Sequence, residues 1–181
     1  MKTRYKWTVA DYHQLIETGL LEGKPVELLE GELIEMSPEG IPHSYTNDSV
    51  VKYLRRTLRG LADVKESHPI TLDNSEPEPD IVIVRLPEEI YKQHHPYPED
   101  IYWLIEVSNR TLEKDLKEKT ITYARNGIPE YWVIDLPNKK LWVFAQSEKS
   151  VYRQTKEFTT GTVSLQSFPN VSIELKHLLL Y

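Results

Sequence analysis

Two acidic residues stand in or beside apolar runs where carboxylates are unusual. Asp80 directly precedes the run 81–84, and Glu106 lies inside the run 101–107, the most apolar stretch of the chain. A carboxylate in a buried strand is costly to desolvate unless a cation or several hydrogen-bond donors satisfy it. The two residues therefore indicate a site at the strand ends, with a cation close by.

A lysine has a similarly unusual position on the expected helix 111–126. Lys119 shares a helical stripe with Leu112, Leu116 and Tyr123, because residues three and four apart lie on one face of a helix. This spacing directs its ammonium group inward, towards the sheet.

Two acids and a lysine on one side of a sheet suit a hard cation with a positive partner. Carboxylates hold Mg²⁺ or Mn²⁺ together with water and phosphate oxygens, and such a site fits phosphodiester hydrolysis. Lys119 would position the attacking water or stabilise the charge that develops on the phosphate.

Other interpretations of these residues stay open at this stage. Asp80 after Pro79 is also typical of a turn, and Glu106 with Lys119 could be a buried ion pair without a catalytic role. Asp115 lies four residues before Lys119, so the two could instead pair on a solvated helix face.

Further residues are candidates for accessory roles. His43 stands at the start of the expected helix 43–61, and Glu32 is the first choice among the glutamates of the hairpin 26–36. The helix also carries a basic stripe, which either contacts a phosphate backbone or is simply solvated. This basic stripe consists of Lys52, Arg55, Arg56 and Arg59.

Composition restricts the possible classes of protein. The 181 residues carry 22 Lys and Arg against 28 Asp and Glu, a formal net charge of -6, and no Cys. A polybasic nucleic-acid binder, a disulfide scaffold and thiolate metal sites are thereby excluded. The length fits a single domain, 1–181, and no apolar run is long enough for a membrane span, so we expect a cytoplasmic protein.

The pattern of elements predicts an α/β fold with a mixed sheet. An N-terminal helix and the hairpin come first, and strand-like alternation recurs in the tail. The expected helices are 9–17, 43–61 and 111–126, and the expected strands are 64–72, 81–84, 101–107, 130–135 and 140–145.

Several short motifs, taken in order, resemble a known family. They are the segment 27–38, His43, Pro79-Asp80, the segment 104–108, Asp115 with Lys119, and the segment 123–135. Together, over residues 8–145, they resemble the Uma-type family of bacterial restriction-endonuclease-like proteins, which looks like a branch of the PD-(D/E)XK nuclease superfamily.

The resemblance implies a core of a four-stranded mixed sheet flanked by helices and a Mg²⁺- or Mn²⁺-dependent endonuclease acting on DNA. It implies that Asp80 and Glu106 are the acidic residues of the two motifs, with the carbonyl of Val107 as an additional ligand. The usual lysine two residues after the second acid is replaced by Ser108. Similar proteins supply this lysine from the following helix, and Lys119 is the matching position.

The resemblance also implies a homodimer, since nucleases of this type often pair to cut two strands. The aromatic residues Trp142 and Phe144 could form an interface or belong to the core. The alternative functions are a non-catalytic binding module that keeps the nuclease fold, and a hydrolase of a small phosphate or sugar.

Overall fold

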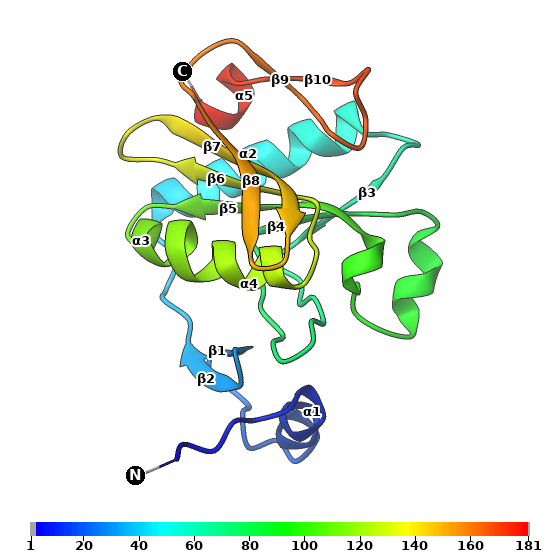
Figure 1. Ribbon diagram of the computed structural model, residues 1–181, viewed down its shortest axis with the longest axis vertical. Helices are drawn as coiled ribbons and strands as arrows, with labels where there is room; N and C mark the ends of the chain where they lie inside the picture. The colour runs from blue at the N-terminus through cyan, green and yellow to red at the C-terminus, as the bar shows by residue number, and fades with distance from the viewer. Residues whose placement is uncertain (1–2, 181) are drawn as a thin grey trace.

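A mixed six-stranded sheet forms the centre of the computed structural model, which describes residues 3–180 (Figure 1). The strand order is β3-β4-β5-β6-β7-β8, in which β5 and β6 are parallel and all other neighbours are antiparallel. The strands are β3 Asp63–Glu66, β4 Ile81–Val84, β5 Ile101–Ser108, β6 Glu130–Asp135, β7 Lys140–Glu148 and β8 Val151–Phe158.

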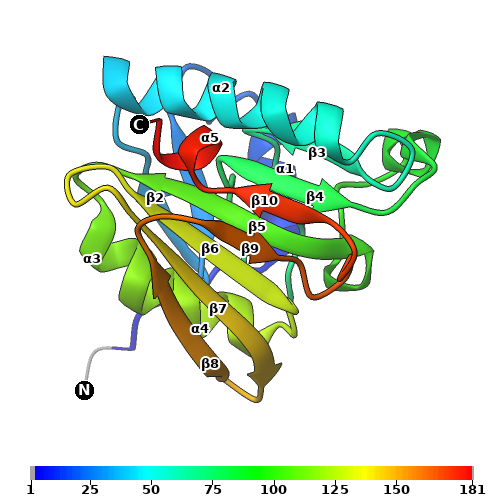
Figure 2. The same ribbon diagram turned by 90° about the horizontal axis from the view of Figure 1, so that it is seen from above.

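Helices cover both faces of this sheet (Figure 2). One face carries the long helix α2, Ile41–Thr57, together with β9, Thr162–Ser164, β10, Ser172–Glu174, and α5, Lys176–Leu179. The other face carries the helical segment that connects β5 to β6. This segment consists of α3 Leu112–Lys114, the π-helical turn η3 Asp115–Lys119 and α4 Thr120–Arg125.

The remaining elements lie beyond the helical segment or in loops. The hairpin of β1 and β2 and the helix α1 extend from this side of the sheet (Figure 1). The elements are α1 Val9–Glu17, β1 Val26–Leu29, β2 Glu32–Glu35, and the 3₁₀ turns η1 Glu88–Lys92 and η2 Pro98–Asp100.

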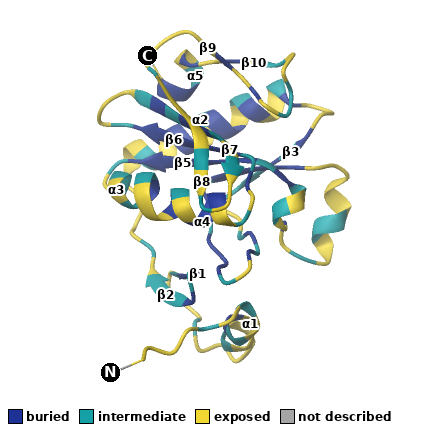
Figure 3. Ribbon diagram, in the orientation of Figure 1, coloured by how far each residue is buried: buried dark blue, intermediate teal, exposed yellow. Residues whose placement is uncertain are grey.

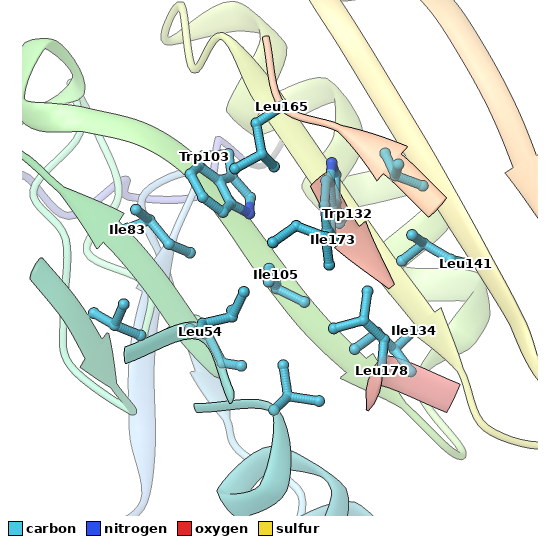
Figure 4. Packing of buried hydrophobic residues seen from close by; sticks show 14 of the residues in the cluster. Leu54, Ile83, Trp103, Ile105, Trp132, Ile134, Leu141, Leu165, Ile173 and Leu178 are labelled. Atoms are coloured by element: carbon cyan, nitrogen blue, oxygen red, sulfur yellow. The ribbon is translucent and has the colours of Figure 1, made fainter. Parts of the chain in front are cut away.

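Alternation along the central strands divides the core into two halves. Trp103 and Ile105 of β5 point to the α2 side, whereas Leu104 points to the α4 side, because successive side chains of a strand face opposite ways. Figure 4 shows Trp103 beside Trp132 in the first half, with Leu178 of α5 packed against the same cluster. The central strands are buried on both faces, whereas α1 is largely exposed (Figure 3).

Gly31 closes the β1-β2 hairpin in a conformation that other residues rarely adopt. Its φ is +73°, and a Cβ atom there would lie 3.0 Å from the side chain of Lys6. The backbone N–H of Trp7 donates to its carbonyl, so the N-terminal segment passes directly over the turn. This close contact leaves no room for a side chain at Gly31.

The structure confirms the α/β class, the mixed sheet and the N-terminal helix and hairpin, but the sheet has six strands rather than four. The sixth strand, β8, was not expected because its residues are mostly polar and exposed, as is usual for an edge strand. The expected strand 64–72 ends at Glu66, and Ser67 then takes a positive φ. Helix α2 begins two residues earlier than expected, with a proline in its first turn.

No helix within residues 3–180 is both long and apolar enough to cross a membrane. The finding agrees with the absence of a long apolar run in the sequence.

We expect Leu178→Ala to destabilise the fold by about 2–5 kcal/mol, the usual range for truncating a fully buried leucine. The matched control is Leu61→Ala, because Leu61 is 44% exposed and should change the free energy of unfolding by less than about 0.5 kcal/mol. Urea denaturation monitored by tryptophan fluorescence measures both. Equal effects of the two substitutions would show that α5 does not seal this half of the core.

Candidate active site

Asp80 and Glu106 face each other across two antiparallel strands. The pairing of Ile81 with Ile105 places Asp80, one residue before β4, opposite Glu106 near the end of β5. Glu106 lies two residues after Leu104, and Asp80 lies two residues before Val82. Because Leu104 and Val82 both face α4, the side chains of Glu106 and Asp80 face α4 as well. Directly opposed residues have Cβ atoms about 5 Å apart, which brings the two carboxyl groups within reach of one cation.

Asp80 is held by one backbone and one side-chain donor. The N–H of Val107 donates to Oδ2 of Asp80 over 2.6 Å, and Nε2 of His43 lies 3.1 Å from the same oxygen. Burial lowers the pKa of His43, but the hydrogen bond and charge of Asp80, with the charges of Glu39 and Glu106, outweigh burial and raise this pKa. Oδ1 of Asp80 accepts no hydrogen bond from the residues that the structure describes.

Glu106 is almost completely buried and receives two donors on one oxygen. Nζ of Lys119 donates to Oε1 over 2.8 Å, and the hydroxyl of Tyr123 donates to the same atom over 2.9 Å. Burial raises the pKa of Glu106, and the charges of Asp80 and Asp115 add to this although Lys119 opposes it. Within residues 3–180, no group donates a hydrogen bond to Oε2.

Lys119 is the positive centre of this group. It is 7% exposed and lies 3.8 Å from Oδ1 of Asp115 in addition to its bond with Glu106. Burial lowers the pKa of Lys119, but the charges of Glu106, Glu27 and Asp115 outweigh this and hold it above its ordinary value. The ammonium therefore stays protonated at neutral pH.

The π-helical turn η3 begins at Asp115 and ends at Lys119, and both residues are buried. The hydroxyl of Ser108 donates a short hydrogen bond to Oδ2 of Asp115, and the hydroxyl of Thr111 donates to the same oxygen over 2.7 Å. Together these two hydroxyls hold the buried carboxylate of Asp115 in place. π turns are rare and concentrate at functional sites, so this turn agrees with a functional role for the segment that connects β5 to β6.

Glu27 reaches the cleft, whereas Glu32 does not. Glu27 is 2% exposed, accepts from Nζ of Lys114 over 2.9 Å and receives the backbone N–H of Glu78. Glu32 lies beside the hairpin turn and pairs with Lys6 over 2.9 Å. The glutamate expected to join the metal site therefore lies outside the cleft lining. Nothing in the sequence separates the two, because the docking of the hairpin decides which glutamate faces the cleft.

These side chains line an open cleft of about 490 Å³. Among the described residues, carboxylates outnumber ammonium groups in its lining, since only Lys114 and Lys119 oppose them. A cleft with this excess of negative charge fits a divalent cation and its oxygen ligands. The lining carboxylates are Glu27, Glu35, Glu39, Glu78, Asp80, Glu106 and Asp115.

The basic stripe, which runs along α2 to Arg59 two residues beyond its end, is exposed, but two of its four side chains have partners within the protein. Nζ of Lys52 lies 2.6 Å from Asp48, and Nε of Arg55 donates to the carbonyl of Val64 over 3.2 Å. The side chains of Arg56 and Arg59 form no ion pair or hydrogen bond with any residue from 3 to 180. Within residues 3–180, Arg56 and Arg59 have no bond to lose, and the terminal nitrogens of Arg55 stay available to a phosphate beside its Nε bond.

Phe144 belongs to the core rather than to an exposed interface. It is 7% exposed, and its ring stacks on that of Tyr131 with centroids 5.7 Å apart. Trp142 is partly buried, with Nζ of Lys140 4.9 Å from its ring centroid. The homodimer stays a prediction that rests on the family resemblance alone.

The comparison with protein families decides where this chain belongs. A family model named Uma2 and described as "Putative restriction endonuclease" matches residues 9–176. The chain belongs to the Uma2 family. The match includes Asp80, Glu106 and Lys119, so the site described above lies inside the family's own region.

A solved structure has the same fold as this Uma2 chain. It comes from Anabaena variabilis ATCC 29413 and is described as "a putative nuclease belonging to DUF820". The TM-score is 0.66, the sequences are 18% identical, and the alignment covers 86% of this chain and 89% of the other. No curated protein matches the chain. Family and fold together support a nuclease.

We expect Lys119→Met to destabilise the Uma2 chain by about 3–5 kcal/mol, because it leaves the buried carboxylate of Glu106 without its cation. Adding Glu106→Gln should recover part of this loss, since the amide carries no charge. Chemical denaturation of both single variants and the double variant measures the coupling.

The matched control is Lys117→Met, two residues away in the same π turn. Lys117 pairs with Glu113 on the surface, so its replacement should leave stability nearly unchanged. If Lys119→Met and Lys117→Met had the same effect, the burial of the Glu106–Lys119 pair would not contribute as described.

Proposed function

We propose that the protein is a divalent-metal-dependent endonuclease that hydrolyses phosphodiester bonds of nucleic acid, with DNA as the substrate. The observation that carries the proposal is the arrangement of Asp80 opposite Glu106, with Lys119 bound to Glu106 in an acidic cleft. Two carboxylates and one fixed ammonium match the needs of metal-assisted attack of water on a phosphate.

Asp80 and Glu106 are the proposed ligands for Mg²⁺ or Mn²⁺, with the carbonyl of Val107 as a third. Lys119 and Tyr123 both donate to Oε1 of Glu106, so its other oxygen would be the one to hold the cation. Val107 also holds Asp80 through its N–H, which fixes the carboxylate relative to the end of β5. When bound, the cation lowers the pKa of a water molecule and offsets the charge of the phosphate.

Lys119 acts as a charged donor in this proposal. Because neighbouring carboxylates raise its pKa, the amine is protonated at neutral pH and does not serve as a general base. Its ammonium orients the attacking water or stabilises the negative charge of the transition state. The hydroxyl of Tyr123 donates to the same oxygen of Glu106 as Lys119 does, so the carboxylate that holds the ammonium is itself held in place.

Charge controls how the substrate approaches. The carboxylates of the cleft repel a phosphate backbone, and a bound divalent cation offsets two of their charges. Arg56 and Arg59, on the exposed side of α2 and just beyond it, supply attraction away from the cleft. The acidic net charge of -6 is thus compatible with a nuclease that depends on its cation.

The principal test is cleavage of plasmid and linear DNA by purified protein with Mg²⁺ or Mn²⁺. We expect Asp80→Asn and Lys119→Met each to lower the rate about 100-fold or more, the usual effect of removing one group that stabilises developing charge. A chelator should abolish cleavage, and Lys117→Met should cleave like the wild type.

The alternatives predict different outcomes in the same assay. Binding of Mn²⁺ and DNA without cleavage of any DNA or RNA would instead indicate a non-catalytic module with the nuclease fold. Cleavage limited to small phosphodiesters would indicate a hydrolase of small substrates. Either result would overturn the proposed endonuclease.

DNA affinity measured against salt concentration tests the basic stripe. Four phosphate contacts give a slope of log K against log salt of about -3.6, by about 0.9 per contact on duplex DNA. If only Arg56 and Arg59 contact phosphates, the slope is about half as steep. Replacing either arginine by Ala should then reduce the magnitude of the slope by about 0.9. An unchanged slope in both variants would place the DNA on another surface.

A further inference from the structure

Outside the cleft, two histidines approach the buried carboxylate of Glu76 from different parts of the chain. Nε2 of His13 lies 2.8 Å from each oxygen of Glu76, and Nε2 of His95 lies 4.0 Å from its Oε1. His13 belongs to α1, Glu76 to the segment before β4, and His95 to the loop between η1 and η2. Both imidazoles thus turn the same nitrogen, Nε2, towards one carboxylate oxygen.

The carboxylate of Glu76 is held firmly in place. Its side chain is 3% exposed, and its Oε2 accepts a hydrogen bond from the hydroxyl of Thr71 over 3.0 Å. The backbone N–H of Glu76 donates to the carbonyl of Leu28 over 2.8 Å, which ties this segment to β1. Neighbouring donors that fix a carboxylate in this way are typical of the residues that orient metal ligands.

The two imidazoles, by contrast, can adjust their positions. The side chains of His13 and His95 are 47% and 46% exposed. At 4.0 Å, His95 forms no hydrogen bond with Glu76, so its ring can turn without losing a bond there. Bonds from zinc to imidazole nitrogen are about 2.0–2.1 Å long, so both rings must move a short way to share one ion. Their exposure permits this movement.

The neighbouring histidine of the same loop has a different environment. Nδ1 of His94 lies 2.8 Å from the backbone carbonyl oxygen of His95, and its ring stacks on that of Tyr97 with centroids 4.6 Å apart. The backbone N–H of Thr71 donates to the carbonyl of Pro96 over 2.9 Å, which holds the loop beside Glu76. The loop therefore directs His95, rather than His94, to the carboxylate.

These side chains line an open pocket of about 570 Å³. Among the described residues, none lines both this pocket and the acidic cleft. Glu17 also lines the pocket, four residues after His13 on the same face of α1, and offers a further oxygen. The pocket thus combines two imidazoles with carboxylates and an open side through which an ion can enter.

The ligand set differs in kind from that of the cleft. Imidazole nitrogens favour Zn²⁺ and related transition metals, whereas Mg²⁺ prefers oxygen ligands. We propose that His13, Glu76 and His95 bind one Zn²⁺, with the remaining position open to water or Glu17. The ion would join α1 and the loop 93–97 to the segment before β4. This site shares no residue with the proposed active site and does not rest on the proposed function.

Co²⁺ is a suitable probe, because it takes the place of Zn²⁺ and its visible absorption reports the ligands around it. Untagged protein is titrated with Co²⁺ in excess Mg²⁺, with no nucleic acid present. The wild type should bind one Co²⁺ per chain with the intense absorption of a four-coordinate site, and Zn²⁺ should displace it. Zn²⁺ should also raise the unfolding temperature, because it binds the folded chain.

Replacing the exposed ligands tests the assignment. His13→Gln and His95→Gln should each weaken Co²⁺ binding about tenfold or more and remove the effect of Zn²⁺ on unfolding. The matched control is His94→Gln, one residue away in the same loop, which should bind Co²⁺ like the wild type. Because His95 forms no hydrogen bond with Glu76, His95→Gln should unfold at the wild-type temperature without metal, which separates loss of a ligand from loss of the fold.

Asp80→Asn distinguishes this site from the acidic cleft. The variant should keep the Co²⁺ spectrum and the effect of Zn²⁺, whether or not the wild type cleaves DNA. Equal Co²⁺ binding by the wild type, His13→Gln and His95→Gln would overturn the inference, and so would loss of the spectrum in Asp80→Asn. Binding that needs His95 in a protein that cleaves no nucleic acid would support the zinc site and refute the endonuclease.

Discussion

The buried contact between Glu106 and Lys119 is the interaction on which the arrangement of the site depends. A carboxylate at the end of a central strand is tolerable only because an ammonium group and a phenol meet it there. This requirement fixes the distance between the helical segment and β5, and it limits where the rest of the segment can pack. The fold therefore supports the site and is also constrained by it.

The sequence alone was sufficient to predict the elements that carry this contact. The apolar run of β5, the proline before β4 and the inward stripe of the helical segment together place Asp80, Glu106 and Lys119 on one side of the sheet. Each inference used local periodicity and the cost of burying charge, which do not depend on distant parts of the chain. The structure brings the two acids face to face through strand register, which the spacing in the sequence does not specify.

Other features could not be predicted because they depend on tertiary contacts. Glu27 and Glu32 have the same chemistry and similar neighbours, and only the docking of the hairpin decides which one reaches the cleft. The edge strand β8 is polar along most of its length and owes its place to pairing with β7. The π turn is also invisible in the pattern of apolar residues, since Leu116 and Tyr123 point inward in either kind of helix.

The π turn has a consequence for how this segment tolerates changes in length. A π turn holds one more residue than an α-helical turn, so it is equivalent to a single-residue insertion in a regular helix. Deleting one residue between Asp115 and Lys119 would restore regular geometry and leave the following residues on nearly the same face, because the π turn already absorbs the extra residue. Tyr123 and the rest of α4 would then stay on the sheet, so the irregular turn is the place where the connection from β5 to β6 can lose a residue without losing its packing.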